Sequence, residues 1–420
     1  MKLLLSAWAC LPNRSTEPGN GWGWATELAR LGIEVHVLTS AENRGLIEEY
    51  LQSNPIGGMY FWYIDSPLRW LTGVRFGYIL WQWSALKKAR ALHRVTKFDI
   101  AHHVTLGSVH VPSQLWRLGI PVVFGPVGGG QTAPHSMLSY FGRSEAAERR
   151  RTLLTRMLRH SPLHRAWLGR MTSVFVTNRD TLELVESLGR RDAKLMFDTA
   201  LPASFRAAEP RRFSDRPVPL RLLWVGTIVP RKAISLTLDI LAKANCPVTL
   251  TIIGDGIEPS LMSRLIADRG LSDRVLWSGR RLPFAEVRAA YLDHDALLFT
   301  SLRDSCAAQL LEAMAMGLPI ITLDLHGAVD LVPVDAEYKI PVIDPEQVIR
   351  DAAAALDRFA SLSGEERSRM SVAGWSFAQG MTYSNRAKQM ETIYESVVAS
   401  RQPAPSMLHA STRTRYGTGE

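Results

Sequence analysis

Cysteine is scarce in this sequence, and long apolar stretches are missing. Three cysteines, Cys10, Cys246 and Cys306, stand among 420 residues. They are too few and too scattered for a disulfide scaffold or a cysteine-based zinc site, so we expect a reducing compartment. The apolar run at the N-terminus is far shorter than the roughly 20 residues of a membrane-spanning helix. It predicts a buried first strand, and we expect a cytoplasmic protein that is soluble or peripheral to a membrane.

Common catalytic motifs are also missing. The sequence has no H-E-x-x-H zinc motif, no G-x-x-x-x-G-K-[ST] phosphate loop and no G-x-S-x-G nucleophile elbow. One D-x-D triplet, at residues 293–295, imitates a metal motif. It closes a predicted helix and opens a predicted buried strand, so we expect neither a metal site nor a bound cofactor.

Acidic residues are under-represented only in the first half of the chain. The net charge is +9; residues 1–200 hold 24 basic and 15 acidic side chains, whereas residues 201–420 hold 25 of each. Eight arginines lie within residues 142–170, together with apolar side chains at helical spacing: Leu153, Leu154, Met157 and Leu158. Such a helix is either a solvated surface or one that lies on an anionic membrane. No nucleic-acid-binding module accompanies it, which argues against a nucleic-acid partner.

Short apolar runs alternate with helical patterns along most of the chain. This alternation predicts parallel sheets wound by helices. Residues 202–219 are rich in proline and poor in apolar side chains, which indicates a linker. We therefore predict an α/β protein with two doubly wound Rossmann-like domains, residues 1–201 and 220–376, facing a central cleft. The polar residues 401–420 are expected to be disordered.

The strongest chemical signal follows a predicted strand that ends at Thr300. A polar loop with Asp304 and Ser305 leads into a predicted helix at residues 307–316. Backbone N–H groups at the start of that helix would bind an anion such as a diphosphate. Glu312 is spaced to reach ribose hydroxyls. The alternative is a capping aspartate and a solvated glutamate.

A second signal is a pair of cations after another predicted strand. The strand at residues 222–225 runs into a turn at Gly226, and Arg231 and Lys232 precede the next predicted helix. Cations at that place would clamp phosphate oxygens. The alternative is that both cations are solvated in a loop and bind no ligand.

Two glycine clusters lie in the predicted first domain, where they would let the backbone approach a ligand closely. The first cluster, expected between the first strand and the first helix, comprises Gly19, Gly21 and Gly23. The second cluster, after the strand predicted at residues 122–125, comprises Gly128, Gly129 and Gly130. The first cluster lacks the full G-x-G-x-x-G spacing, so it indicates a dinucleotide site only weakly.

Two adjacent histidines, His102 and His103, end another predicted strand of the first domain. Either side chain would donate a hydrogen bond to a sugar hydroxyl or a phosphate. A histidine at a strand end is more often structural, and both interpretations stand at this point.

The second-half motifs resemble the signature of the GT-B retaining glycosyltransferases of family four. The acid-x7-acid pair Asp304 and Glu312 and the run E-A-M-A-M-G-L-P at residues 312–319 carry the resemblance. The I-I-G-D-G run at residues 252–256 supports it. Residues 102–130 are similar to a bacterial branch that makes exopolysaccharides and cell-surface polysaccharides. The resemblance implies a GT-B fold and a retaining, metal-independent hexosyltransferase that uses a nucleotide-diphospho-sugar.

The resemblance also implies roles for individual residues. Glu312 would hold the ribose, Arg231 and Lys232 would neutralise the diphosphate, and Asp304 would orient the sugar ring as a catalytic residue. Further donor-binding residues would be Gly19, Gly21, Gly23, Gly226, Gly254, Ser305, Cys306 and Ala307. Residues on the acceptor side of the cleft would be Gly128, Gly129 and Gly130. The helix within residues 377–399 would cross back to the first domain, whose basic surface suits a lipid-linked saccharide acceptor at the anionic inner leaflet.

Three departures from the family pattern keep other functions open. Asp304 stands where glutamate is usual, Thr227 stands where arginine commonly contacts the diphosphate, and Pro126 with its preceding glycine stands where a histidine is common. The last departure makes His102 and His103 candidate catalytic residues. A nucleotide-sugar epimerase or hydrolase of the same fold, or an inactive subunit that binds nucleotide or polysaccharide, therefore remains an alternative.

Overall fold

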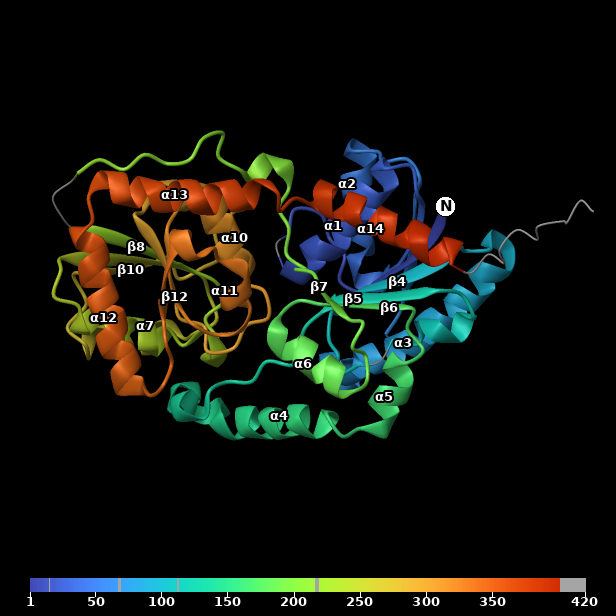
Figure 1. Cartoon of the computed structure of the whole chain (residues 1–420), viewed down its shortest axis with the longest axis horizontal. Helices are drawn as coiled ribbons and strands as arrows, with labels where there is room; N and C mark the ends of the chain where they lie inside the picture. Colours follow the sequence, from blue (N-terminus) through green and yellow to red (C-terminus); the bar gives the residue numbers. More distant parts are fainter. Residues whose placement is uncertain (15, 67–68, 112, 216–218, 401–420) are drawn as a thin grey trace, which may run out of the picture.

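Two parallel β-sheets, each covered by helices on both faces, form two lobes that lie side by side (Figure 1). The computed structural model describes residues 1–400 except 15, 67–68, 112 and 216–218. The predicted disorder of residues 401–420 therefore lies outside the described residues. The prediction of an α/β protein with two doubly wound domains is confirmed.

The first sheet has the strand order β3-β2-β1-β4-β5-β6-β7, and all its strands run parallel. Its strands are β1 (Lys2–Ala7), β2 (Glu34–Ser40), β3 (Met59–Ile64), β4 (Ile100–Thr105), β5 (Val122–Val127), β6 (Ser173–Val176) and β7 (Lys194–Leu195). The inner strands read as continuous apolar runs because helices bury both faces of the sheet. The sequence pattern does not predict the edge strands β3 and β7, whose residues are mostly half-buried or exposed.

The helices of the first half begin where short polar residues or prolines favour a helix start. Asn178 accepts a hydrogen bond from the N–H of Thr181 and so caps α6 (2.9 Å). The helices are α1 (Thr16–Arg30), α2 (Arg44–Ser53), α3 (Arg69–Thr96), α4 (Glu145–Leu158), α5 (Pro162–Leu168) and α6 (Arg179–Ser187). Shorter helical turns are η1 (Ala41–Asn43), η2 (Leu115–Leu118), η3 (His135–Ser144) and η4 (Ala203–Phe205). Within the described residues, no helix is both long and apolar enough to cross a bilayer.

The second sheet has the strand order β10-β9-β8-β11-β12-β13 and is also parallel throughout. Its strands are β8 (Leu220–Val225), β9 (Val248–Ile253), β10 (Val275–Trp277), β11 (Ala296–Phe299), β12 (Ile320–Leu323) and β13 (Glu337–Ile340). Its helices are α7 (Ile234–Lys243), α8 (Pro259–Ala267), α9 (Phe284–Asp293), α10 (Ala308–Ala315), α11 (His326–Leu331), α12 (Pro345–Ser361) and α13 (Gly364–Gln379), with turns η5 (Pro230–Lys232) and η6 (Val334–Ala336). The strands predicted at residues 222–225 and before Thr300 are present as β8 and β11.

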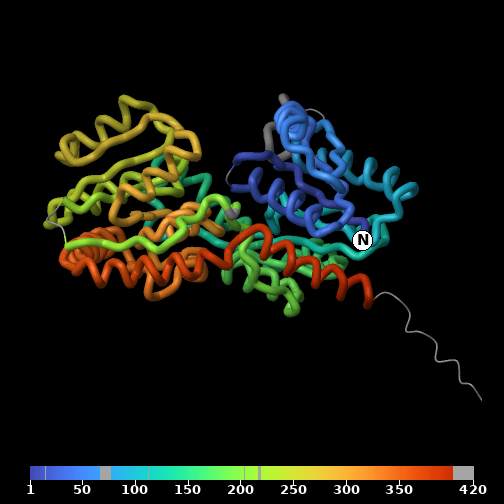
Figure 2. The backbone as a smooth tube through the Cα atoms, turned by 90° about the horizontal axis from the view of Figure 1, so that it is seen from above, coloured from blue at the N-terminus to red at the C-terminus, as the bar shows by residue number. Residues whose placement is uncertain are grey.

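The chain crosses between the lobes and then returns, and the two crossings touch each other. The N–H of Leu201 donates to the carbonyl of Met381 (3.0 Å), and the N–H of Tyr383 donates to the carbonyl of Leu201 (3.3 Å). Helix α14 (Tyr383–Ala399) then runs along the first lobe (Figure 2). Its Met390 and Tyr394 are fully buried in the core that α1 shares with the first sheet.

A segment of the first half reaches the other way. Met137, Leu138 and Phe141 in η3 are buried in the core of the second lobe, where Trp224 also lies. Helix α4 follows and runs along both lobes at the bottom of Figure 1. The sequence pattern does not predict this exchange, because an apolar residue does not show which sheet it will cover.

Candidate active site

A cavity of about 530 Å³ lies between the lobes, at the carboxyl ends of both sheets. Glu17, Gly128, Gly129, Arg151 and Asp198 line it from the first half. The second half contributes Thr227, Arg231, Lys232 and Asp304 together with residues 305–309. The place is the one expected for a ligand of parallel α/β sheets. We call it the cleft cavity.

Asp304 holds the two predicted cations together. Its Oδ2 accepts from Lys232 Nζ (2.7 Å) and Arg231 Nη1 (2.9 Å), and its Oδ1 accepts from the N–H of Ser305 (3.0 Å). Burial raises the pKa of Asp304, but the two cations outweigh burial and hold that pKa well below its usual range. Burial lowers the pKa of Lys232, and Asp304 opposes that effect. The structure therefore presents an ionised carboxylate and two cations at one wall of the cavity.

Helix α10 begins at this wall without a side-chain cap. Ala307 occupies the capping position in extended backbone and makes no side-chain hydrogen bond there. We find no acceptor in the described chain for the backbone N–H groups of residues 306–309, which line the cavity. Such N–H groups, together with the helix dipole, favour an anion.

Ser305 joins this wall to the first lobe. Its Oγ lies 2.5 Å from Thr177 Oγ1, and its carbonyl accepts from Asn178 Nδ2 (3.0 Å). Gly128 permits this approach, because a Cβ at that position would lie only 2.0 Å from Ser305 Oγ. Gly129 also lines the cavity. Gly130 does not; it lies against the backbone of Asp180 at the start of α6.

The predicted donor-binding residues Glu312 and Cys306 are both buried, and only Cys306 lines the cavity. Glu312 is only 6% exposed and accepts a hydrogen bond from Tyr291 Oη (2.8 Å). Burial raises its pKa, which Tyr291 and Lys232 partly offset. Cys306 lines the cavity with its thiol largely buried, and burial raises the pKa of that thiol.

Gly226 and Gly254 follow the ends of β8 and β9, where the backbone conformation favours glycine. A Cβ on Gly254 would lie 1.9 Å from the carbonyl oxygen of Gly226, and both glycines have left-handed φ angles (149° and 153°). Neither lines the cavity, although the next residue, Thr227, does.

The expectation that Gly19, Gly21 and Gly23 lie between the first strand and the first helix is wrong, because all three lie inside α1. A Cβ on Gly21 would lie 2.1 Å from the carbonyl oxygen of Ala9, and one on Gly23 would lie 2.4 Å from the ring of Tyr383. These glycines let other segments pack closely on the helix, and none of them lines the cleft cavity.

The histidines do not reach the cleft cavity either. His102 and His103 have no exposed surface, and burial lowers their pKa values to about 3 and about 4. The His102 ring lies 2.5 Å from both Tyr394 Oη and the carbonyl of Gly125. Both rings are part of the first-lobe core, so the structure assigns them no contact with a substrate.

Two carboxyl groups that the sequence analysis did not single out complete the cavity. Glu17 accepts from the N–H of Gly107 (2.8 Å), and its pKa is raised by burial. Burial, assisted by Glu17, raises the pKa of Asp198 to about 7. Glu17 lies in the glycine-rich motif, so the sequence did contain a feature that pointed to it. Asp198 follows a two-residue strand, and no sequence motif surrounds it. Only its position just before the crossing could have indicated it.

The cleft cavity therefore has two unlike walls. The second-lobe wall offers Arg231, Lys232 and free backbone N–H groups, which suit a diphosphate. The first-lobe wall offers the carboxyl groups of Glu17 and Asp198, which suit hydroxyl groups. Among the described residues, no group of three histidine, cysteine, aspartate or glutamate side chains is arranged to hold a metal ion.

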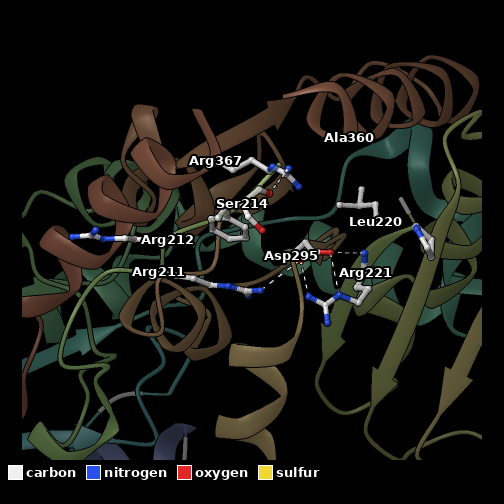
Figure 3. Close-up of a pocket in the computed structure, with 10 residues that line it drawn as sticks. Arg211, Arg212, Ser214, Leu220, Arg221, Asp295, Ala360 and Arg367 are labelled. Atoms are coloured by element: carbon white, nitrogen blue, oxygen red, sulfur yellow. Dashed lines mark hydrogen bonds and ion pairs between the residues drawn. The ribbon is translucent and has the colours of Figure 1, made fainter. Parts of the chain in front are cut away.

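A second cavity, of about 320 Å³, lies at the amino ends of β8 and β11 in the second sheet (Figure 3). Three of its arginines contact other protein groups: Arg221 and Arg211 pair with Asp295 (3.0 and 3.5 Å), and Arg367 donates to the carbonyl of Ser214 (3.3 Å). These contacts fasten the linker to the second lobe. The cavity faces away from the carboxyl strand ends, so it is not the candidate active site.

Two protein-family models match the chain. The family model described as Glycosyltransferase Family 4 matches residues 23–196, and the model described as Glycosyl transferases group 1 matches residues 219–358. The 2-deoxystreptamine glucosyltransferase of Streptomyces kanamyceticus is 33% identical over 92 residues, which cover 22% of this chain and 24% of that protein. The lipopolysaccharide 1,6-galactosyltransferase of Salmonella typhimurium is 31% identical over 122 residues, or 28% of this chain and 34% of that protein. The chain thus matches only about a quarter to a third of these relatives' lengths.

Solved structures support the architecture over nearly the whole chain. HepE of Anabaena, determined in complex with UDP-glucose, superposes with a TM-score of 0.61 at 14% identity, covering 94% of this chain and 100% of that one. Identity this low shows the fold alone. The two family models, the parallel sheets and the cleft together make this chain a GT-B protein that is similar to glycosyltransferase family 4.

Proposed function

We propose that the chain is a retaining glycosyltransferase that moves a sugar from a nucleotide-diphospho-sugar to a lipid-linked saccharide in the synthesis of a surface polysaccharide. The observation that carries this proposal is the second-lobe wall, where Lys232, Arg231 and the unbonded N–H groups at the start of α10 face one cavity. The complex of HepE with UDP-glucose and the lipopolysaccharide transferase relative support a nucleotide-sugar donor and a surface-glycan acceptor.

The chemistry follows from charge and position. When the bond between the sugar's anomeric carbon and the diphosphate breaks, negative charge develops on the leaving diphosphate. Lys232, Arg231 and the helix N-terminus stabilise that charge without having to reorganise. Asp304 holds both cations in place until the donor arrives. The acceptor hydroxyl forms the new bond on the same face, and its proton passes to Asp198, a carboxyl group in the same cavity.

A donor screen tests this function. Release of nucleoside diphosphate is measured with UDP-, GDP-, ADP- and dTDP-sugars in the presence of lipid-linked saccharides, with and without EDTA. We expect release from one donor that depends on the acceptor and is unchanged by EDTA. Lys232→Ala should lower kcat/KM by about 10²–10³-fold, the loss typical when one charge-stabilising donor is removed. The exposed Lys243→Ala, at the end of α7, is the matched control.

The other outcomes point to other functions. Nucleotide binding with no release from any donor would favour a non-catalytic binding subunit. Conversion or hydrolysis of the donor without an acceptor would favour an epimerase or a hydrolase.

Helix α4 supports a peripheral position on an anionic membrane. Its inner side carries Glu148, which pairs with Arg303, whereas Leu153, Leu154 and Met157 are 58%, 52% and 58% exposed on the outside. Arg149, Arg150 and Arg156 are exposed on the same helix. An outward apolar stripe flanked by arginines fits an anionic lipid surface.

Vesicle flotation tests this position. We expect the protein to float with vesicles that contain phosphatidylglycerol and not with purely zwitterionic vesicles. Leu153→Ser with Leu154→Ser should abolish flotation. Leu276→Ser, at a residue that is 70% exposed in β10, should leave it unchanged. Equal flotation of both variants would contradict the proposal.

A further inference from the structure

A large cavity separate from the cleft cavity lies where the two chain crossings meet. It has a volume of about 680 Å³, and its walls come from α1, α2, α9, the outgoing crossing and the start of α14. A neighbouring cavity of about 350 Å³ shares Asn13, Arg14 and Tyr50 with it. We call the two together the hinge groove.

Aromatic rings form much of the hinge groove, and other rings hold them in place. The ring of Trp22 meets Tyr50 edge-on at 5.2 Å between centroids and stacks on Phe61 at 5.9 Å. Phe284 is 44% exposed, and its ring lies 4.4 Å from that of Phe205. Trp22, Tyr50 and Phe284 line the groove, whereas Phe205 lies in the second-lobe core behind it.

The first glycine cluster shapes this groove. Gly23 has no Cβ that would strike the ring of Tyr383, so the first residue of α14 lies directly on α1. Tyr383 Oη then donates to Asn20 Oδ1 (2.8 Å). Tyr383 lines the hinge groove and Asn20 lines the cleft cavity, so this hydrogen bond belongs to the partition between the two. The glycine motif thus shapes an aromatic-lined groove that is separate from the cleft cavity.

The lining indicates the class of ligand. Polar side chains stand between the rings: Asn13, Arg14, Thr26, Glu27 and Arg30. Arg30 is already paired with Glu27, which disfavours a phosphate. A lipid tail would cover the exposed Asn13 and Arg14 with hydrocarbon and leave them without hydrogen-bond partners. A sugar presents apolar C–H faces to aromatic rings and hydroxyl edges to amides and charges, so it satisfies both parts of the lining.

We propose that the hinge groove binds an oligosaccharide segment while the cleft cavity is free for the donor. The choice of saccharides as ligands rests on the proposed function. Because the walls come from both lobes, a bound segment contacts both of them. That arrangement suits the part of a growing glycan that is remote from the reacting hydroxyl.

Titration calorimetry with defined tetrasaccharides tests this proposal. Maltotetraose, cellotetraose, laminaritetraose and chitotetraose are titrated into the full chain, alone and with millimolar UDP, GDP or ADP. We expect at least one to bind in both conditions. Trp22→Ala and Phe284→Ala should each weaken that binding about tenfold or more. Leu292→Ala, on the same helix as Phe284 but outside the groove, should leave binding unchanged.

Three outcomes would overturn the proposal: no tetrasaccharide binds, a nucleotide displaces the bound one, or both aromatic variants bind as well as the unaltered chain. Thermal denaturation of each variant shows whether lost binding is merely lost folding. The proposed transferase function is judged separately, by nucleoside diphosphate release and its dependence on Lys232. Failure of the groove with intact release would therefore leave that function standing.

Discussion

Replacing Gly128 by alanine should hold the two lobes apart without unfolding either. The added Cβ would lie 2.0 Å from Ser305 Oγ and 3.0 Å from Ser305 Cβ. To escape, the Ser305 hydroxyl must rotate away from Thr177 Oγ1 (2.5 Å) and Asn178 Nδ2 (3.1 Å). Two neutral hydrogen bonds of about 0.5–1.5 kcal/mol each are lost. The sum, about 1–3 kcal/mol, corresponds to a ~5–150-fold shift toward separated lobes.

Three measurements check the Gly128→Ala prediction. kcat/KM for the donor found in the screen should fall within that range, small-angle scattering should show a larger radius of gyration, and the melting temperature should change little. Ser305→Ala in the Gly128→Ala background removes the clashing oxygen and should restore part of the activity. Gly45→Ala is the control, because a Cβ on Gly45 in α2 would meet no atom within 4 Å. Full activity of Gly128→Ala, or a melting temperature that falls in step with activity, would refute the reasoning.

Two further predictions concern buried titratable groups. The pKa of Asp198 is raised to about 7, so the folded chain binds a proton there that the unfolded chain releases near pH 4. The stability of the unaltered chain relative to Asp198→Asn should therefore fall as pH rises from about 4 to 7 and level off above; urea denaturation across that range measures it, and a constant difference would contradict the assignment. Tyr394→Phe removes the hydroxyl that lies 2.5 Å from His102 Nδ1 and should cost about 1–3 kcal/mol of unfolding free energy. Tyr60→Phe, at a residue that is 49% exposed, should cost almost nothing.

Much of the architecture could be predicted because the buried strands of a parallel sheet can be recognised from the local sequence. Strands such as β8 and β12 are continuous apolar runs, and helical patterns separate them. The edge strands are harder to recognise from sequence, because β3 is mostly half-buried and β7 has only two residues. The exchange of η3 into the second lobe depends on packing between distant segments, which no local pattern contains.

The second-lobe wall of the site could also be predicted, since Asp304 and Lys232 each follow a recognisable strand and meet at 2.7 Å. The first-lobe wall could not. Glycine disfavours helices, so the run from Gly19 to Gly23 indicated a loop, but close packing of other segments requires glycine inside α1. Asp198 enters the cavity only because the chain turns toward the crossing there.

The exchange of segments between the lobes limits how this chain can be recombined. Each half of the sequence contributes one element to the opposite lobe. The first half places η3 in the second lobe, and the second half places α14 on the first lobe. A chimera joined only within residues 202–219 would therefore bring a foreign Phe141 to one core and a foreign Tyr394 to the other. Swapping donor specificity between related enzymes requires that residues 133–141 and 383–399 stay with the lobe they cover. The functional unit of exchange is thus discontinuous in the sequence, and a single cut in the linker does not separate it.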